Sequence, residues 1–186
     1  AESRPIKGTR GRGATAGEDA ALVAELRTSE KDRQENLMIV DLVRNDLGRV
    51  AEAGTVQVPE LFKIETYHTV HQMVSYIECR LRGDVDAVDA VRETFPMGSM
   101  TGAPKRRTLM LIDELEELPR GAYSGGIGYF TLHGAADLSV GIRLAVLRPG
   151  RRAWMGAGGA VLAGSDPLGE WAEAGVKAGA VTRAWA

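Results

Sequence analysis

Apolar residues recur at helical spacing in the first quarter of the chain. Residues 18–27 and 30–47 each repeat them every three or four positions, which predicts two helices. Ser29 stands where its hydroxyl can cap the second helix, whose apolar residues cover most of its circumference. We therefore expect the second helix to be buried. Glu35 and Asp41 would then be buried acids, and buried acids need partners.

Alternation of apolar and polar residues follows the second helix. It predicts strands at residues 56–58, 62–64 and 70–82. A glycine turn then leads into helices expected at residues 87–94 and 104–118. The middle of the chain should therefore contain both kinds of element.

The last third of the chain is rich in glycine. Three β segments, at 124–132, 137–147 and 152–162, are separated by short polar turns and predict an antiparallel meander. Helical spacing returns at residues 167–185. Helices and strands in this order favour an α+β fold, a mixed α/β layered domain.

The composition indicates which kinds of binding partner and which cellular compartment to expect. With 23 Lys and Arg against 25 Asp and Glu, the 186 residues carry a net charge of −2, which gives no reason to expect nucleic acid. Cys79 is the only cysteine, so no internal disulfide can form and a reducing, cytoplasmic location fits best. No apolar run approaches the ~20 residues that span a bilayer, so we expect no membrane partner.

The chain begins without methionine and reaches a dense motif at once. Residues 5–9 read Pro-Ile-Lys-Gly-Thr, and a chemically important segment is unusual at a chain end because termini fray. We therefore expect residues 1–186 to be the C-terminal portion of a single domain whose N-terminal half is absent.

Lys7 is the first candidate for chemistry. The proline before it and the glycines after it allow a turn that can hold the lysine amine in a cleft. Partial burial there would lower the pKa of the amine and make it a nucleophile near neutral pH. The alternative is an exposed lysine in a glycine- and arginine-rich loop. Nucleic-acid binding through residues 10–13 is a weaker alternative, because the tract is short and lacks aromatic residues.

The last expected helix carries a candidate metal site. Glu170, Glu173 and Lys177 are spaced so that they share one helical face. Glu173 could meet Glu35 of the second helix and hold Mg²⁺, which prefers a few carboxylates plus water and leaves positions for an anionic substrate. The alternative is a solvated face with one ion pair, worth ~0.3–0.5 kcal/mol.

Other candidates lie in or near the expected strands. Arg143 is expected in mid-strand, where it either snorkels at an edge or grips a carboxylate through both nitrogens. Tyr123 could position a substrate through its hydroxyl, or could simply pack. The glycine-rich residues 156–160 predict backbone close to a ligand, or a bulged strand. His68 and His71, three apart on an expected strand, should point to opposite faces and are not expected to share a metal.

Taken together, these motifs resemble the C-terminal half of the chorismate-utilising enzymes. The match covers nearly the whole chain and runs through residues 5–9, 35–46, 98–105, 123–125, 142–143 and 165–177. The resemblance implies part of a chorismate-binding two-sheet sandwich with outer helices, with chorismate as substrate and Mg²⁺ as cofactor. It implies that Glu35 and Glu173 are Mg²⁺ ligands and that Glu170 is an outer or water-bridged one. It also implies a set of substrate-binding groups, namely Arg143, Tyr123, Lys177, Thr9 and the backbone of Gly158 and Gly159.

Lys7 is the residue that discriminates within this family. Anthranilate, salicylate and isochorismate synthases usually carry alanine there, whereas lysine is similar to the aminodeoxychorismate synthases, component I. The resemblance implies that the amine attacks C2 of chorismate as the C4 hydroxyl leaves, and that ammonia then attacks C4 and displaces the lysine. It implies ammonia from a glutamine amidotransferase and a place in 4-aminobenzoate and folate biosynthesis. The alternatives are an anthranilate synthase component I-like enzyme and a non-catalytic fragment that keeps the chorismate-binding fold.

Four features depart from the family pattern. Gln72 replaces a histidine that assists pyruvate loss in anthranilate synthases, which agrees with an enzyme that stops at the aminated intermediate. Ala160 replaces a glycine, and Ala174 replaces a threonine. The family's general acid for the C4 hydroxyl lies in a Ser-Pro-Glu segment upstream of the lysine, and this sequence contains no such segment. We therefore expect the isolated chain to be inactive or nearly so.

Overall fold

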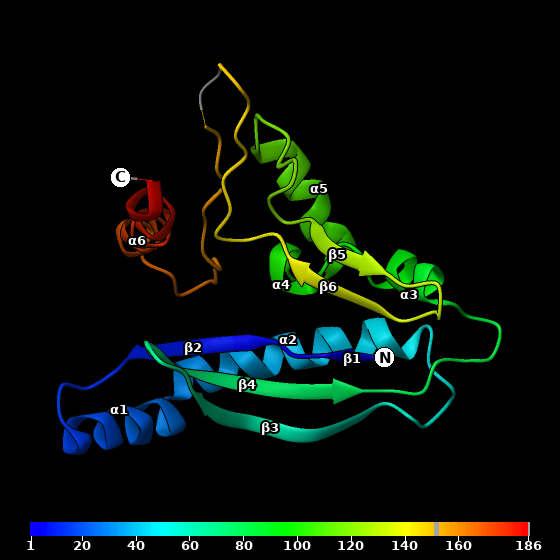
Figure 1. Ribbon diagram of the computed structural model, residues 1–186, viewed down its shortest axis with the longest axis horizontal. Coiled ribbons are helices and arrows are strands. Elements are labelled where there is room, and N and C mark those ends of the chain that lie inside the picture. The colour runs from blue at the N-terminus through cyan, green and yellow to red at the C-terminus, as the bar shows by residue number, and fades with distance from the viewer. Residues whose placement is uncertain (151–152, 186) are drawn as a thin grey trace. The chain divides into compact units, whose positions relative to one another are not determined.

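A computed structural model describes residues 1–150 and 153–185. The chain divides into two compact units, Ala1–Ser99 and Met100–Ala186, and each is described separately (Figure 1). Within the described residues, no helix combines the length and the apolar character needed to cross a bilayer.

The first unit is built on an antiparallel sheet whose central strand is β4 (Val70–Glu78). One edge of β4 pairs with β3 (Gln57–Thr66), and the other pairs with β2 (Ile6–Gly11) and the short β1 (Glu2–Ser3). Figure 1 shows β4 between β2 and β3. The unit also contains α1 (Ala16–Thr28), α2 (Glu30–Gly48) and α3 (Ala87–Thr94). The expected strands at 56–58 and 62–64 are therefore parts of one strand.

Local sequence explains where the first helices begin. Thr15 caps α1 and forms a reciprocal capping box with Glu18, and Ser29 caps α2 by accepting from the Asp32 N–H. The Ser29 cap confirms the prediction from the sequence. The helix expected at 104–118 is α5 (Lys105–Leu115).

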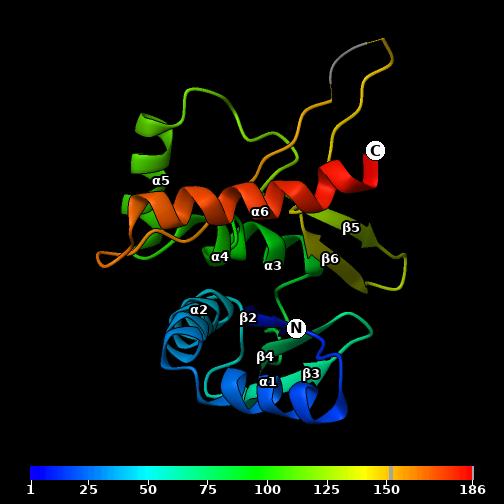
Figure 2. The same cartoon turned by 90° about the vertical axis from the view of Figure 1, so that its left-hand side faces the viewer.

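The core of the first unit lies between α2 and β4. Alternate β4 residues face the helices, as their period of two requires, and Met73 and Ile77 are wholly buried there. Val40 and Leu47 of α2 pack into the same layer together with Cys79. Helices α1 and α2 therefore cover one face of the sheet (Figure 2).

The prediction that α2 is buried over most of its circumference is wrong. Leu37 is 45% exposed, and Asp41 is an exposed acid that pairs with Arg44 at 3.1 Å. The buried residues of α2, among them Ile39 and Val40, lie on the face that meets β4.

The second unit contains one hairpin and one long helix. After α4 (Gly98–Thr101) and α5, β5 (Gly126–Phe130) pairs antiparallel with β6 (Ala136–Val140). The unit ends in α6 (Pro167–Trp185), which agrees with the helix predicted from the sequence (Figure 2). Mixed helices and strands confirm the α+β fold class.

The three-stranded meander is not found in the described residues. β6 ends at Val140, and residues 153–162 contribute a single bridge, Val146 to Trp154, rather than a strand. Arg152, with which the third segment was expected to begin, lies outside the described residues. Glycines at 156, 158 and 159 provide no side chains to pack on a pleated surface, which disfavours a strand there.

Candidate active site

Lys7 lies on a bulged strand rather than in a turn, so the predicted turn is wrong. Ile6 pairs with Val74 and Thr9 with Gln72, so three steps along β2 oppose two steps along β4. The extra residue falls at Lys7–Gly8, where Gly8 has φ +89°. A bulge redirects side chains, and here it holds Lys7 half-buried.

Gly8 is needed in the bulge for packing as well as for its backbone conformation. A Cβ atom added to it would lie 2.9 Å from the Asp32 side chain of α2 and 2.9 Å from Leu26 Cδ1 of α1. Only glycine lets β2 approach both helices so closely. An open pocket of about 580 Å³ on this unit runs along α1 beside residues 12–14 and is not lined by Lys7.

Thr9 belongs to a row of polar residues across the sheet. It pairs with Gln72 of β4, and Gln72 pairs on its other side with Glu65 of β3. Paired residues share a face, and the neighbouring His71 is buried on the helix side, so this row lies on the opposite face. The hydroxyls of Tyr67 and Tyr76 donate to Glu65 and hold the pKa of its carboxyl below the usual value.

Glu35 lies on α2, and its side chain is 18% exposed, with Lys31 Nζ 3.9 Å away. Asn36 beside it is wholly buried: it accepts from Ser75 Oγ at 2.6 Å and donates to the Met73 carbonyl at 3.4 Å. These bonds fix the rotation of α2 about its axis and thereby the direction of Glu35. The sequence analysis missed Asn36, although an amide among apolar helix residues was a usable signal.

Three predicted residues of α6 meet one loop in the second unit. Lys177 Nζ lies 2.6 Å from Glu173 Oε1 and donates to the Gly158 carbonyl at 3.2 Å. A Cβ added to Gly159 would lie 2.9 Å from Glu170 Oε2, 3.7 Å from Lys177 Nζ and 3.9 Å from Glu173 Oε1. The shared helical face predicted from the sequence therefore surrounds the backbone at Gly159.

Tyr123 reaches the same loop from the other side. A Cβ at Gly156 would lie 2.3 Å from Tyr123 Cγ, and one at Gly158 would lie 3.3 Å from the tyrosine hydroxyl. The glycines of this stretch let the loop pack on a tyrosine ring and on acids of α6. That its backbone lies close to a ligand stays a prediction, and the alternative of a bulged strand is wrong. Tyr123, Gly158, Gly159, Glu170, Glu173 and Lys177 form one cluster, which we call the α6 cluster.

Arg120 supports Tyr123, and the sequence analysis missed it. Its guanidinium stacks 5.8 Å from the centre of the Tyr123 ring and donates to the Met100 carbonyl and to Ser124 Oγ. Ser124 has a φ of +72°, a conformation unfavourable for serine that its backbone bond to the Gly141 carbonyl helps to hold. The same guanidinium holds the pKa of the Glu116 carboxyl below its usual value.

Arg143 does not lie in mid-strand, so that prediction is wrong. β6 ends three residues earlier, and Arg143 is exposed with a φ of +54°. A non-glycine residue in this left-handed conformation marks local strain, which is typical of functional segments. No described contact joins it to the α6 cluster.

The histidines and the predicted metal-binding acids lie in separate parts of the structure. His71 bonds Thr66 and Asp19 in the core, whereas His68 lies in the β3–β4 turn and not on a strand. Within the described ranges, no three acidic, histidine or cysteine side chains are grouped as a metal site. Glu170 and Glu173 supply two carboxylates in the second unit, while Glu35 belongs to the first. Their convergence with Lys7 stays a prediction.

Gly156→Ala should destabilise the second unit. The added methyl would collide with the Tyr123 ring, and relieving such overpacking costs about 1–3 kcal/mol. We expect a fall of that size in the free energy of unfolding, measured by urea denaturation. Gly164→Ala is the matched control, because a Cβ there meets nothing within 4 Å. Equal stability of the two variants would contradict the packing described here.

With this geometry established, comparison with known proteins identifies the family. A model of the family described as "chorismate binding enzyme" matches residues 1–183. The chain belongs to this family. A similar curated protein is aminodeoxychorismate synthase of Streptomyces griseus, 62% identical over 98% of the chain and 25% of that protein. Anthranilate synthase component 1 of Acinetobacter calcoaceticus is 45% identical over 97% of the chain and 36% of that protein.

Comparison with solved structures supports the same family. Anthranilate synthase component I from Streptococcus pneumoniae TIGR4 has a TM-score of 0.86 to this chain at 37% identity, covering 97% of the chain and 39% of that structure. The chain therefore spans only about a quarter to two fifths of the relatives it matches. These matches establish the fold and the family of the chain.

Proposed function

We propose that the chain is the C-terminal portion of the chorismate-binding domain of an aminodeoxychorismate synthase of the component I type. The reaction is conversion of chorismate and ammonia to 4-amino-4-deoxychorismate. The observation that carries the proposal is Lys7, held half-buried on the bulge of β2. The higher identity to the Streptomyces griseus synthase than to the Acinetobacter anthranilate synthase supports the same choice.

Lys7 acts as the nucleophile in this proposal. Its amine attacks C2 of chorismate and gives up a proton, both conjugated ring double bonds shift towards C4, and the C4 hydroxyl takes a proton and leaves as water. Ammonia then attacks C4 and gives up a proton, both double bonds shift back, and the lysine amine takes a proton and leaves C2. The residue enters and departs unchanged, so one difficult substitution becomes two easier ones.

The other predicted residues bind and orient chorismate. Lys177 and Arg143 offer positive charge to its carboxylates, and the Tyr123 hydroxyl and the Gly158–Gly159 backbone offer hydrogen bonds. Thr9 lies two residues from Lys7 on the same strand and would contact the substrate beside the nucleophile. Orientation of this kind can supply a large part of a rate enhancement.

The residues present fit Mg²⁺ as a cofactor. Glu170 and Glu173 place two carboxylates beside Gly159, where only a glycine leaves room, and oxygen donors of this kind suit magnesium. Glu35 would complete the set from the rigidly held α2. When bound, Mg²⁺ would hold the ring carboxylate of chorismate and offset its charge.

Ammonia would come from a glutamine amidotransferase partner or domain, and the product would lead to 4-aminobenzoate and folate. A reducing, cytoplasmic compartment suits Cys79, which is free and buried. Activity is expected of the full-length protein, since this chain has no Ser-Pro-Glu segment to supply the acid for the C4 hydroxyl.

A product assay tests the proposal. The full-length protein is incubated with chorismate, Mg²⁺ and ammonium at raised pH, and the products are separated. We expect aminodeoxychorismate. Fluorescent anthranilate in its place would make the chain part of an anthranilate synthase. No product, together with no Mg²⁺ binding by calorimetry, would leave a non-catalytic binding fragment.

A further inference from the structure

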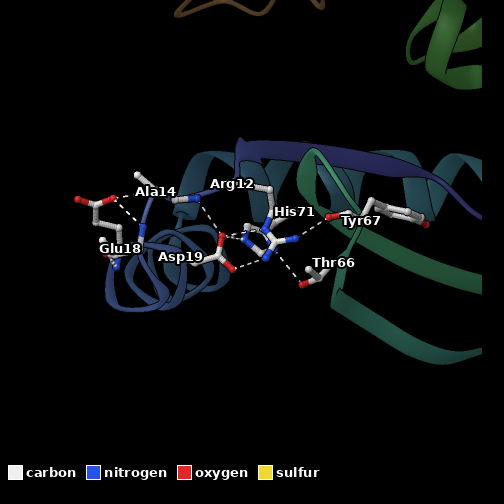
Figure 3. Close-up of polar contacts among 9 residues, drawn as sticks. Arg12, Ala14, Glu18, Asp19, Thr66, Tyr67 and His71 are labelled. Carbon is white, nitrogen blue, oxygen red and sulfur yellow. Dashed lines mark hydrogen bonds and ion pairs between the residues drawn. The ribbon is translucent and has the colours of Figure 1, made fainter.

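The carboxylate of Asp19 gathers four hydrogen-bond donors in the first unit (Figure 3). Arg12 donates to it through Nε and Nη2, both at 2.8 Å, and the backbone N–H of Gly13 donates at 2.9 Å. His71 Nε2 lies 2.9 Å from the same carboxylate. Arg12, the Gly13 backbone and His71 together hold the pKa of Asp19 well below its usual value, so the group is ionised at neutral pH.

The hydrogen bond to Asp19 places a proton on one ring nitrogen of His71. An ionised carboxylate only accepts, so Nε2 must carry the proton and donate it. Nδ1 is 2.9 Å from Thr66 Oγ1, which can donate to it when the ring is neutral. His71 is 1% exposed, so loss of its partner would leave a buried donor unsatisfied.

These donors come from segments far apart in the sequence. Arg12 and Gly13 belong to the loop after β2, Asp19 to α1 and His71 to β4. Figure 3 shows Arg12 and His71 meeting at the Asp19 carboxylate. Arg12 Nη1 also donates at 2.9 Å to the carbonyl of Tyr67 in the β3–β4 turn. A Cβ at Gly13 would lie 2.3 Å from the Asp19 nitrogen, so the loop runs directly against α1.

The loop with Arg12 and Gly13 directly follows β2, the strand that carries Lys7. In the sheet register Arg10 pairs with His71 and Thr9 with Gln72, so the Asp19 contacts lie directly behind the Thr9–Gln72 pair, on the helix side of the sheet. Lys7 sits in the bulge between this fastened end and the pairing of Ile6. A strand that slips by one residue turns its side chains to the other face, so the bulge keeps Lys7 in place only while the end of β2 is held.

We propose that Asp19 is a positioning residue for Lys7, because its carboxylate fastens the end of β2 to α1 and β4. This inference rests on the proposed function in giving Lys7 the nucleophilic role. Asp19 itself touches no substrate. Its contribution is to hold the register in which the lysine amine meets chorismate.

A double-mutant cycle in the full-length protein tests this inference. Asp19→Asn keeps the size of the side chain but puts an NH₂ group where four donors need acceptors. We expect kcat for aminodeoxychorismate formation to fall about 10- to 100-fold, as small displacements of reacting groups do. In a Lys7→Ala background the same change should alter the residual rate less than about twofold, because there is no nucleophile left to position. An equal loss in both backgrounds would overturn the inference.

Hydrogen exchange gives a second reading that does not depend on turnover. Asp19→Asn should speed amide exchange in residues 6–13 and in the part of β4 that pairs with them, while β3 residues 57–64 exchange as before. Uniformly faster exchange would show a general loss of stability and count against the inference. Arg12→Lys keeps the positive charge but loses the paired bonds to the Asp19 carboxylate, and should give a smaller effect in the same residues.

Asp84→Asn provides the matched control. It removes an exposed carboxylate that pairs with Arg82 in the same unit, and both rate and exchange should stay unchanged. If Lys7→Ala alone left turnover intact, the proposed function would fail at its nucleophile. The exchange experiment would still decide whether Asp19 fastens β2.

Discussion

Lys7→Ala should lower the rate of aminodeoxychorismate formation by a factor of about 10³ or more, because removing a catalytic nucleophile has effects of that order. The bulge that holds Lys7 depends on Gly8 and not on the lysine side chain, so the fold should survive the change. The measurement is kcat in the full-length protein with chorismate, Mg²⁺ and ammonium.

Lys63→Ala is the control for this prediction. Lys63 is a half-exposed lysine on β3 of the same sheet and pairs with Glu60 at 2.6 Å. Its loss should leave kcat unchanged. Unaltered turnover in Lys7→Ala would mean that ammonia attacks chorismate directly.

Glu173→Gln should weaken Mg²⁺ binding about 100-fold or more. Magnesium prefers ionised oxygen ligands, and the amide removes the charge while keeping the shape. Calorimetric titration of the full-length protein with Mg²⁺ measures the effect. Glu114→Gln, an exposed acid on α5, should bind Mg²⁺ like the unaltered protein.

Lys177→Met should not weaken Mg²⁺ binding as Glu173→Gln does. Its ammonium lies 2.6 Å from Glu173 Oε1 and so competes with any cation for that carboxylate. We expect Mg²⁺ binding to be kept or strengthened, while the KM for chorismate rises. Equal loss of Mg²⁺ binding in Lys177→Met and Glu173→Gln would show that the pair matters only for the local structure of α6.

Local patterns predicted the helices well because caps and helical periods are local. Ser29, the helical spacing before it and the face shared by Glu170, Glu173 and Lys177 needed no knowledge of distant segments. The glycine at position 8 was also recognised as a conformational requirement, although the turn was wrong. Whether a glycine serves a turn or a bulge depends on the partner strand, and β4 lies more than sixty residues further along the chain.

Contacts between distant segments explain most of what the sequence did not reveal. Asp19 and His71 are 52 residues apart, and Asn36 and Ser75 are 39 apart. Asp41 was expected to be buried because the apolar pattern suggested that α2 is covered on all sides. In the structure only one face of α2 is buried, and Asp41 lies on the exposed side. Arg143 follows a regular apolar alternation, but the left-handed backbone at that residue breaks the strand the pattern predicted.

A covalent adduct on Lys7 is the most direct test of its role as the nucleophile. The full-length protein is mixed with chorismate and Mg²⁺ in the absence of ammonia, quenched in acid, and analysed by intact-protein and peptide mass spectrometry. We expect an added mass equal to chorismate minus water, located on the peptide that contains Lys7 and lost when ammonium is supplied. An unmodified Lys7 peptide from protein that forms aminodeoxychorismate under the same conditions with ammonium would contradict that role.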